Sequence, residues 1–145
     1  MSDEKSRCGW SGSDPLYQQY HDNEWGKPVH DDRLFFEMLS LEAAQAGLSW
    51  SLILKRRAAY KDLFDNFDPQ IVATYDEPKL AMLLQEARII RNLRKIRSSV
   101  TNAQAFLKIQ EEFGSFDAYI WRFVGGQPKI NCFAALQDIP ARTPE

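Results

Sequence analysis

Glu42 occupies a position in the sequence that suggests a binding or catalytic role. Residues 32–46, capped by Asp31 or Asp32, predict a helix, and at 100° per residue its apolar side chains sweep one face. Those apolar residues are Leu34, Phe35, Met38, Leu39 and Ala46. Glu42 falls near the middle of their face, where a carboxylate is partly desolvated and needs a partner. Two interpretations follow: a structural glutamate bonded to an arginine or to backbone N–H groups, or the charged floor of a pocket for a cationic ligand.

Aromatic residues gather in the same part of the chain. Three of the four tryptophans (Trp10, Trp25 and Trp50) lie in the first 50 residues, together with Tyr17 and Tyr20. The two tyrosines are three apart and share a helix face. Such residues are usually core, but beside a carboxylate they also describe a slot for a planar cation. Stacking and cation–π contact each contribute about 1–3 kcal/mol in such slots.

A basic run free of acids covers residues 88–97, RIIRNLRKIR, and a second cluster is Lys55-Arg56-Arg57. The whole chain carries a formal net charge of −2, which does not indicate a nucleic-acid-binding protein. A local acid-free run is therefore informative. It is either a solvated helix face or a surface for a phosphate backbone.

Cys8 and His21 are two possible metal ligands near the N-terminus. A structural zinc site needs four ligands, and neither His30 nor Cys132 has a ligand-like spacing. From the residues alone, a metal site is weakly indicated.

Start and stop signals predict an all-α fold, because no segment alternates with period two. The expected helices run from Asp14-Pro15 to about Trp25-Gly26, over 32–46 with Gly47 as the stop, over 50–64 after Ser49, briefly after Asp68-Pro69, over 78–85, over 92–112 before Gly114, and from Ser115 to Gly125-Gly126.

The composition, 44% hydrophobic and 26% charged over 145 residues, predicts a single globular helical domain, 1–145. No apolar run approaches the ~20 residues of a membrane helix, and the N-terminus lacks a signal peptide. We expect a cytoplasmic monomer without a membrane partner. Residues 127–145 have little periodicity, and Arg142–Glu145 look like the start of another helix. We therefore expect that a C-terminal segment is missing.

Several motifs together resemble the type I family of 3-methyladenine DNA glycosylases. They are R-C-G-W, D-P-L-Y-x-x-Y-H-D-N-E-W-G, L-E-x-x-Q-A-G-L-S-W, I-L-K-R-R-x-x-Y, F-D-P, A-x-I-I-R-N-x-x-K-I and N-A-Q-A-F-L. The likeness extends from Cys8 to Pro144. It implies the helix-hairpin-helix glycosylase fold and the hydrolytic removal of 3-methyladenine from alkylated double-stranded DNA.

The resemblance also implies roles for particular residues. Glu42 matches the pocket carboxylate that contacts the damaged base and is the candidate catalytic group. The other matched base-binding residues are Trp10, Tyr17, Tyr20 and Trp50. Gly47 and Leu48 match a loop that wedges the duplex. The hairpin at Ala87–Asn92 and the helix after it match the part of the family fold that binds DNA phosphates. The resemblance therefore implies that four cations contact DNA: Arg88, Arg91, Arg94 and Lys95.

Two departures from the family pattern accompany the resemblance. Cys8 and His21 match two of four structural zinc ligands, and the other two lie in a segment beyond the end of this chain. Arg88 stands where a small hairpin residue, often glycine, is expected. Two other functions remain open: a non-catalytic member that binds alkylated DNA or a protein partner, and a helical scaffold in which Glu42 joins a structural ion pair.

Overall fold

The structure is a computed structural model that describes residues 5–144, and these residues form helices and no strand. The predicted all-α fold is confirmed. Short 3₁₀ turns accompany the helices at η1 (Gly9–Ser11), η2 (Asp65–Phe67), η3 (Arg122–Val124) and η4 (Leu136–Asp138). The α-helices are α1 (Pro15–Asn23), α2 (Asp32–Gln45), α3 (Trp50–Leu63), α4 (Pro69–Val72), α5 (Glu77–Gln85), α6 (Leu93–Phe113) and α7 (Phe116–Trp121).

Capping side chains begin these helices where the sequence predicted. Asp14, Asp31, Ser49, Asn92 and Ser115 each accept a backbone N–H from the first turn of the helix that follows. The last predicted helix is divided, since α7 ends at Trp121 and a 3₁₀ turn continues to Val124. Residues 142–144 are irregular where the sequence suggested a new helix, and Glu145 lies outside the described residues.

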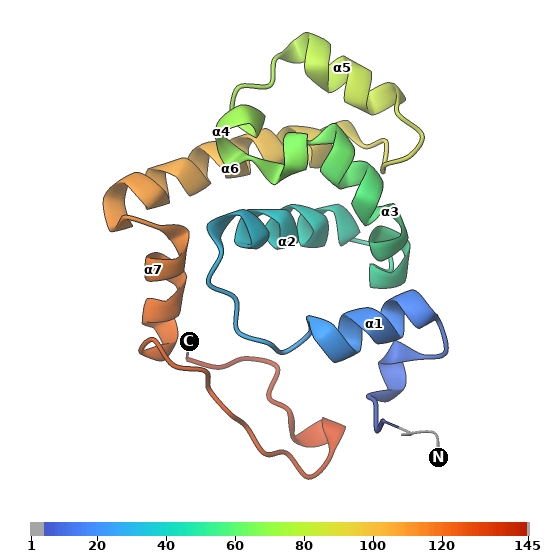
Figure 1. The fold of residues 1–145 in the computed structure, drawn as a ribbon, viewed down its shortest axis with the longest axis vertical. Helices are drawn as coiled ribbons and strands as arrows, with labels where there is room; N and C mark the ends of the chain where they lie inside the picture. Colours follow the sequence, from blue (N-terminus) through green and yellow to red (C-terminus); the bar gives the residue numbers. More distant parts are fainter. Residues whose placement is uncertain (1–4, 145) are drawn as a thin grey trace.

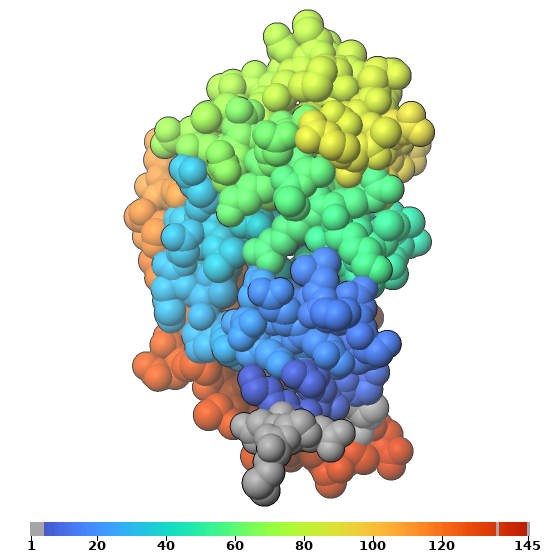
Figure 2. Space-filling model, turned by 45° about the vertical axis from the view of Figure 1, so that its right-hand side comes forward, coloured from blue at the N-terminus to red at the C-terminus, as the bar shows by residue number. Residues whose placement is uncertain are grey.

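Helix α2 lies at the centre of the arrangement, with α1 on one side and α3, α4 and α6 on the other (Figure 1). Helix α5 lies at the top of this view, beyond α4 and α6, and α7 turns back from the end of α6 toward the start of α2. Figure 2 shows the same order on the surface, with α3 to α5 above the N-terminal segment. The largest fully buried side chains include Phe36, Phe64, Phe67, Leu41 and Ile53. None of the helices in residues 5–144 is long and apolar enough to cross a membrane.

Helix α2 buries a different face from the one its apolar residues predicted. Its buried residues are Phe36, Glu37, Ser40, Leu41 and Ala44. The prediction that Glu42 lies in the middle of a buried face is wrong, because Glu42 and Leu39 are exposed. The helical pattern missed the true face because that face contains two polar residues. Ser40 donates its hydroxyl to the carbonyl of Phe36, and Glu37 is neutralised from another helix.

The buried carboxylate is Glu37, and Arg57 of α3 is its partner. The guanidinium Nε of Arg57 lies 2.6 Å from Glu37 Oε1, and its Nη1 lies 2.7 Å from Glu24 Oε2. Glu24 is the C-cap residue that directly follows the end of α1. The guanidinium of Arg57 on α3 therefore bonds both to the buried face of α2 and to the C-terminal end of α1.

Asp32 makes a similar connection at the other end of α2. Its carboxylate accepts the backbone N–H groups of Phe116 and Asp117 and the side-chain amide of Gln110. Burial alone would raise the pKa of Asp32, but these three donors outweigh it and lower the pKa below the usual range. The start of α2 is thereby tied to α6 and α7.

We predict that Arg57→Met lowers the free energy of unfolding by about 3 kcal/mol, because it leaves Glu37 buried without a counter-charge. Arg33→Met is the matched control, since Arg33 forms an exposed pair with Asp68 that is worth less than about 1 kcal/mol. Urea unfolding followed by circular dichroism measures both. Equal stabilities for the two variants would contradict the role given to Arg57.

Candidate functional site

A hollow of about 430 Å³ opens between η1, α1, the end of α2 and the start of α3. Its lining consists of Trp10, Tyr17, Tyr20, Trp25, Glu42, Gln45 and Trp50. Tyr17 and Tyr20 come from one face of α1, and Glu42 and Gln45 from one face of α2. Trp50 is the first residue of α3. Every base-binding residue implied by the resemblance thus borders one hollow.

The aromatic rings of the hollow contact one another in a continuous row. Trp10 lies 5.1 Å from both Tyr17 and Trp25, measured between ring centroids. Tyr17 and Tyr20 are 6.5 Å apart, and Tyr20 meets Trp50 edge-on at 5.5 Å. Rings held by one another keep their orientation before a ligand arrives, which lowers the entropy cost of binding a flat molecule.

Glu42 is the acidic group of the hollow. No hydrogen bond or ion pair joins its carboxylate to any residue in the described part of the chain, and it borders two further hollows. The interpretation of Glu42 as a structural ion-pair residue therefore does not hold; Glu37 has that role. An unpaired carboxylate beside stacked rings is suited to a flat ligand with positive charge or N–H donors.

Tyr20 and Trp50 add polar groups to the same wall. Burial, together with the negative charges of Glu42 and Glu24, raises the pKa of the Tyr20 hydroxyl, which keeps it neutral and able to donate. The indole N–H of Trp50 is buried near the Tyr20 hydroxyl, whose pKa it lowers slightly against the effect of burial, but it makes no hydrogen bond of full geometry within residues 5–144. A buried donor without an acceptor is uncommon in proteins. It lies at the edge of a hollow that is open to a ligand.

Sequence reasoning did not assign two residues of the hollow to the base-binding set: it missed Gln45, and it named Trp25 only among the gathered aromatic residues. Gln45 lies three residues after Glu42, and this helical spacing could have identified it. Trp25 follows the end of α1 in an irregular segment, where no periodicity gives its direction.

The loop after α2 forms a tight turn that presents Leu48. The N–H of Leu48 bonds to the carbonyl of Gln45, and Ala46 has φ −43° and ψ 117°. Gly47 has φ +77°, so the four residues have the form of a type II turn, which requires a left-handed residue at this position. The Leu48 side chain is exposed at its tip. A rigid turn thus presents an apolar side chain next to Trp50.

Some cations of the basic run, residues 88–97, bond to groups of the protein, and others have no partner among the described residues. Arg88 bonds to Asp62 and Glu86, Arg97 bonds to Glu77, and the ammonium of Lys95 bonds to backbone carbonyls. Arg91 and Arg94 are exposed, and no partner of theirs is found within residues 5–144. The structure thus leaves Arg91 and Arg94 free for an external anion, while Arg88 and Lys95 have partners within the protein.

Helix α3 supports the turn at residues 86–92, which joins α5 to α6 as a helical hairpin. Arg56 donates to the carbonyls of Ala87 and Ile89, and the Tyr60 hydroxyl accepts the N–H of Ile90. Asn92 then caps α6 by accepting the N–H groups of Arg94 and Lys95. The other cations of the second basic cluster are also used internally, since Lys55 pairs with Asp14 and Arg57 with Glu37. These contacts fix the direction in which the start of α6 points.

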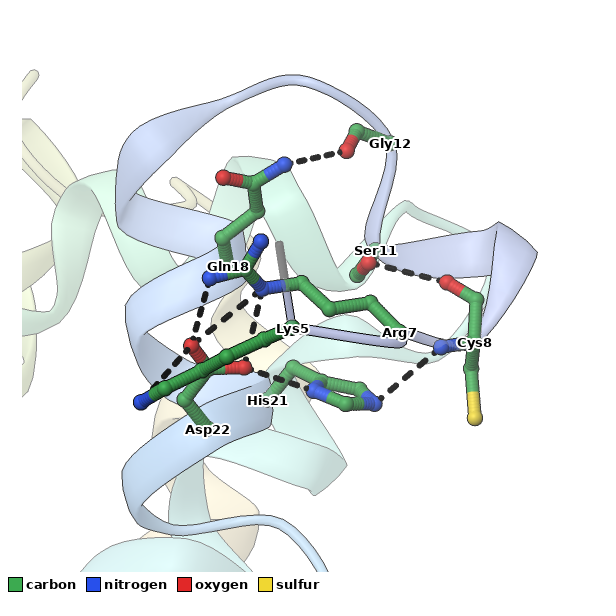
Figure 3. Close-up of polar contacts among 8 residues, drawn as sticks. All are labelled: Lys5, Arg7, Cys8, Ser11, Gly12, Gln18, His21 and Asp22. Carbon is green, nitrogen blue, oxygen red and sulfur yellow. Dashed lines mark hydrogen bonds and ion pairs between the residues drawn. The ribbon is translucent and has the colours of Figure 1, made fainter. Parts of the chain in front are cut away.

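Cys8 and His21 lie next to each other but do not form a metal site by themselves. The imidazole accepts the Cys8 N–H at Nε2, its Nδ1 bonds to Asp22, and the Cys8 sulfur points away from the ring (Figure 3). Within residues 5–144, no group of three or more His, Cys, Asp or Glu residues is arranged to hold a metal ion. A structural zinc ion needs four ligands, so the described residues do not fit zinc.

The helical hairpin and the adjoining aromatic hollow with its free carboxylate define a class: a helix-hairpin-helix protein with a base-sized site. Comparison with known proteins agrees with this class. The sequence model of the methyladenine glycosylase family matches residues 10–145, and the chain belongs to that family.

Similar proteins cover nearly the whole chain. DNA-3-methyladenine glycosylase 1 of Escherichia coli (strain K12) is 44% identical over 137 residues, which span 94% of this chain and 73% of that protein. A crystal structure of a 3-methyladenine DNA glycosylase I matches with a TM-score of 0.90 and 47% identity, covering 96% of this chain and 76% of the other.

A third similar protein is 3-methyladenine DNA glycosylase I of Staphylococcus aureus, whose structure was described for its recognition of 3-methyladenine. It matches with a TM-score of 0.82 and 38% identity over 85% of this chain and 65% of its own. The fold expected from the sequence, that of the helix-hairpin-helix glycosylases, is confirmed by these likenesses.

We predict that Gly47→Ala destabilises the chain by about 1–2 kcal/mol, because φ +77° is unfavourable for any residue with a Cβ atom. An added Cβ meets no atom within 4 Å at Gly47, so the effect reports the backbone alone. Gly9→Ala is the control, since that position is equally open and has no positive φ. Thermal unfolding measures both variants, and an unchanged midpoint for Gly47→Ala would contradict the assigned turn.

Proposed function

We propose that this chain is a DNA glycosylase that flips 3-methyladenine out of alkylated double-stranded DNA and hydrolyses its N-glycosidic bond. The observation that carries the proposal is the unpaired carboxylate of Glu42 facing a row of aromatic rings. Family membership and the names of the similar proteins support it.

The charge of the substrate explains why a carboxylate and flat rings suffice. An adenine methylated at N3 and still attached to its sugar carries a positive charge, and cleavage releases it as a neutral base. Water adds a hydroxyl to the sugar C1′, the C1′–N bond breaks, its electron pair stays with the base, and one proton goes to solvent. The leaving group therefore needs little acid catalysis. The protein must extrude the base, bind it and stabilise the positive sugar.

The hollow would select the base by stacking and charge. Rings such as Trp50 and Tyr20 stack more strongly on an electron-poor base than on neutral adenine. Glu42 would accept N–H donors of the base and stabilise positive charge on the base and on the sugar, as the catalytic group of the site. The neutral hydroxyl of Tyr20 adds a hydrogen bond whose direction adapts to the base.

The DNA would lie across the Leu48 turn and the start of α6. Extrusion of a damaged base costs a few kcal/mol, and an apolar side chain such as Leu48 fills the space that it leaves. The N-terminus of α6 offers a positive dipole end to a phosphate, and Arg91 and Arg94 lie beside it. These two arginines are the cations that we assign to the DNA backbone.

Zinc has no part in this mechanism. Cys8 and His21 would supply half of a four-ligand site, as the resemblance implies, and that role stays a prediction. The monomeric state stays a prediction as well. The second candidate function, a family member that binds alkylated DNA without cutting it, is an outcome of the first experiment below.

We predict that Glu42→Gln reduces the release of 3-methyladenine from methylated duplex DNA at least tenfold and weakens binding of the free base about tenfold. A hydrogen bond to a charged group is worth about 1.5–3 kcal/mol, which corresponds to a factor of ten or more. Chromatography of the released base and titration calorimetry measure the two effects, with unchanged unfolding as the test of an intact fold.

Glu111→Gln is the matched control, because Glu111 is an exposed acid on α6 outside the hollow. If wild-type protein binds the base and releases none from DNA, the chain is a binding protein. If Glu42→Gln loses neither binding nor excision, the hollow is not the site.

We predict that DNA affinity falls steeply with salt and that Arg94→Met reduces the slope of log K against log salt concentration by about 0.9, the value for one phosphate contact. Arg97→Met on the same helix should leave the slope unchanged, because Glu77 already neutralises Arg97. Fluorescence anisotropy with duplex DNA measures the slopes. A flat salt response of the wild type would argue against a phosphate-binding surface.

A further inference from the structure

The side chain of Lys95 reaches from α6 to the end of α2. Its ammonium Nζ donates to the carbonyl of Ala44 at 2.8 Å and to that of Ala46 at 2.6 Å. The last carbonyls of a helix have no partner within the helix, so a cation at this place satisfies them and interacts favourably with the helix dipole. Lys95 thus caps α2 from a helix that lies 49 residues further along the chain.

One of the two carbonyls belongs to the Leu48 turn, the type II turn formed by Gln45, Ala46, Gly47 and Leu48. Ala46 occupies its second position, and fixing its carbonyl fixes the plane of the Ala46–Gly47 peptide. That peptide plane is what separates a type II turn from a type I turn. The contact therefore determines where the Leu48 side chain points.

The backbone of Lys95 lies in the part of α6 that we assign to the DNA phosphates. Its N–H bonds to the capping side chain of Asn92, together with the N–H of Arg94. One residue therefore belongs by its backbone to the first turn of α6 and by its side chain to the Leu48 turn.

We infer that Lys95 is a positioning residue that couples phosphate binding at the start of α6 to the depth at which Leu48 enters the duplex. The inference rests on the proposed function and goes beyond it, because it removes Lys95 from the set of phosphate contacts that the basic run suggested. When a phosphate seats on the α6 N-terminus, Lys95 transmits that position to the turn. Leu48 and Trp50 then stand at a fixed distance from the DNA backbone.

The two roles for Lys95 give different salt dependences. A phosphate contact releases counterions, so its removal lowers the slope of log K against log salt concentration by about 0.9. A lysine bonded to two carbonyls leaves this slope unchanged. The loss should instead appear in base extrusion, because a displacement of about 1 Å in a site can reduce a rate about a hundredfold.

The test compares Lys95→Met with Arg94→Met, because the neighbouring side chain of Arg94 has no partner within residues 5–144. Duplex DNA with 2-aminopurine opposite the target position reports extrusion by its fluorescence at saturating protein, and anisotropy gives the salt slope. We expect Lys95→Met to reduce the extrusion rate at least tenfold with the slope unchanged. Arg94→Met should lower the slope and, at saturating protein, reduce the extrusion rate less than Lys95→Met does.

A second comparison tests whether Lys95 acts through Leu48. In a Leu48→Ala background, Lys95→Met should add less than a twofold further loss of extrusion, since coupled residues are not additive. Two separate, multiplying losses would overturn the inference, and so would a salt slope that falls by about 0.9 with extrusion unchanged. Binding of free 3-methyladenine, which uses the rings and Glu42 and needs no entry of Leu48 into a duplex, should stay within twofold of wild type.

Lys95→Gln covers the case in which the methionine variant does not fold, because its amide retains a donor for one carbonyl. We expect it to keep the salt slope and to restore part of the extrusion rate, and a lowered slope would again overturn the inference. Wild-type protein that neither extrudes nor releases the base would refute the proposed function. A normal wild type with an insensitive Lys95 variant would refute the inference alone.

Discussion

The ion pair between Glu37 and Arg57 determines which face of α2 is buried, and the position of the site depends on that face. The buried face carries Glu37, which is possible because Arg57 of α3 supplies its counter-charge and reaches Glu24 at the end of α1 as well. The same contact holds α1 and α3 at the position where their aromatic residues meet. The opposite face of α2 borders open hollows, and Glu42 on that face has no hydrogen-bond or ion-pair partner within residues 5–144. The buried carboxylate of Glu37 is neutralised, and the exposed carboxylate of Glu42 is left available to a ligand.

The sequence predicted the elements well because their limits are local. Caps such as Asp14, Ser49 and Asn92 bond within the turn that they begin, so short-range chemistry specifies them. The face of α2 was predicted wrongly because it is a tertiary property. Glu37 looks like a surface residue until Arg57 is placed beside it, and Leu39 looks like a core residue although it borders an open hollow.

In the site as well, local features could be predicted from the sequence and tertiary contacts could not. Glu42 and the rings were identified from their gathering near the N-terminus and from the family resemblance, and the structure brings them to one hollow. The structure places Glu42 beside the rings, its role in the site stays a prediction, and the expectation that it is buried was wrong. Within the basic run, no pattern separates Arg94 from Lys95, since both are cations at the start of the same helix. Two backbone carbonyls from a distant segment separate them, and a sequence does not show that contact.

The central claim is that a methylated base binds against the rings beside Glu42. Titration of the protein with 3-methyladenine and, in parallel, with adenine tests it most directly, followed by tryptophan fluorescence, because three of the four tryptophans line the hollow. We expect saturable quenching by 3-methyladenine at concentrations where adenine has little effect. Equal quenching by both bases, or none by either, would contradict it.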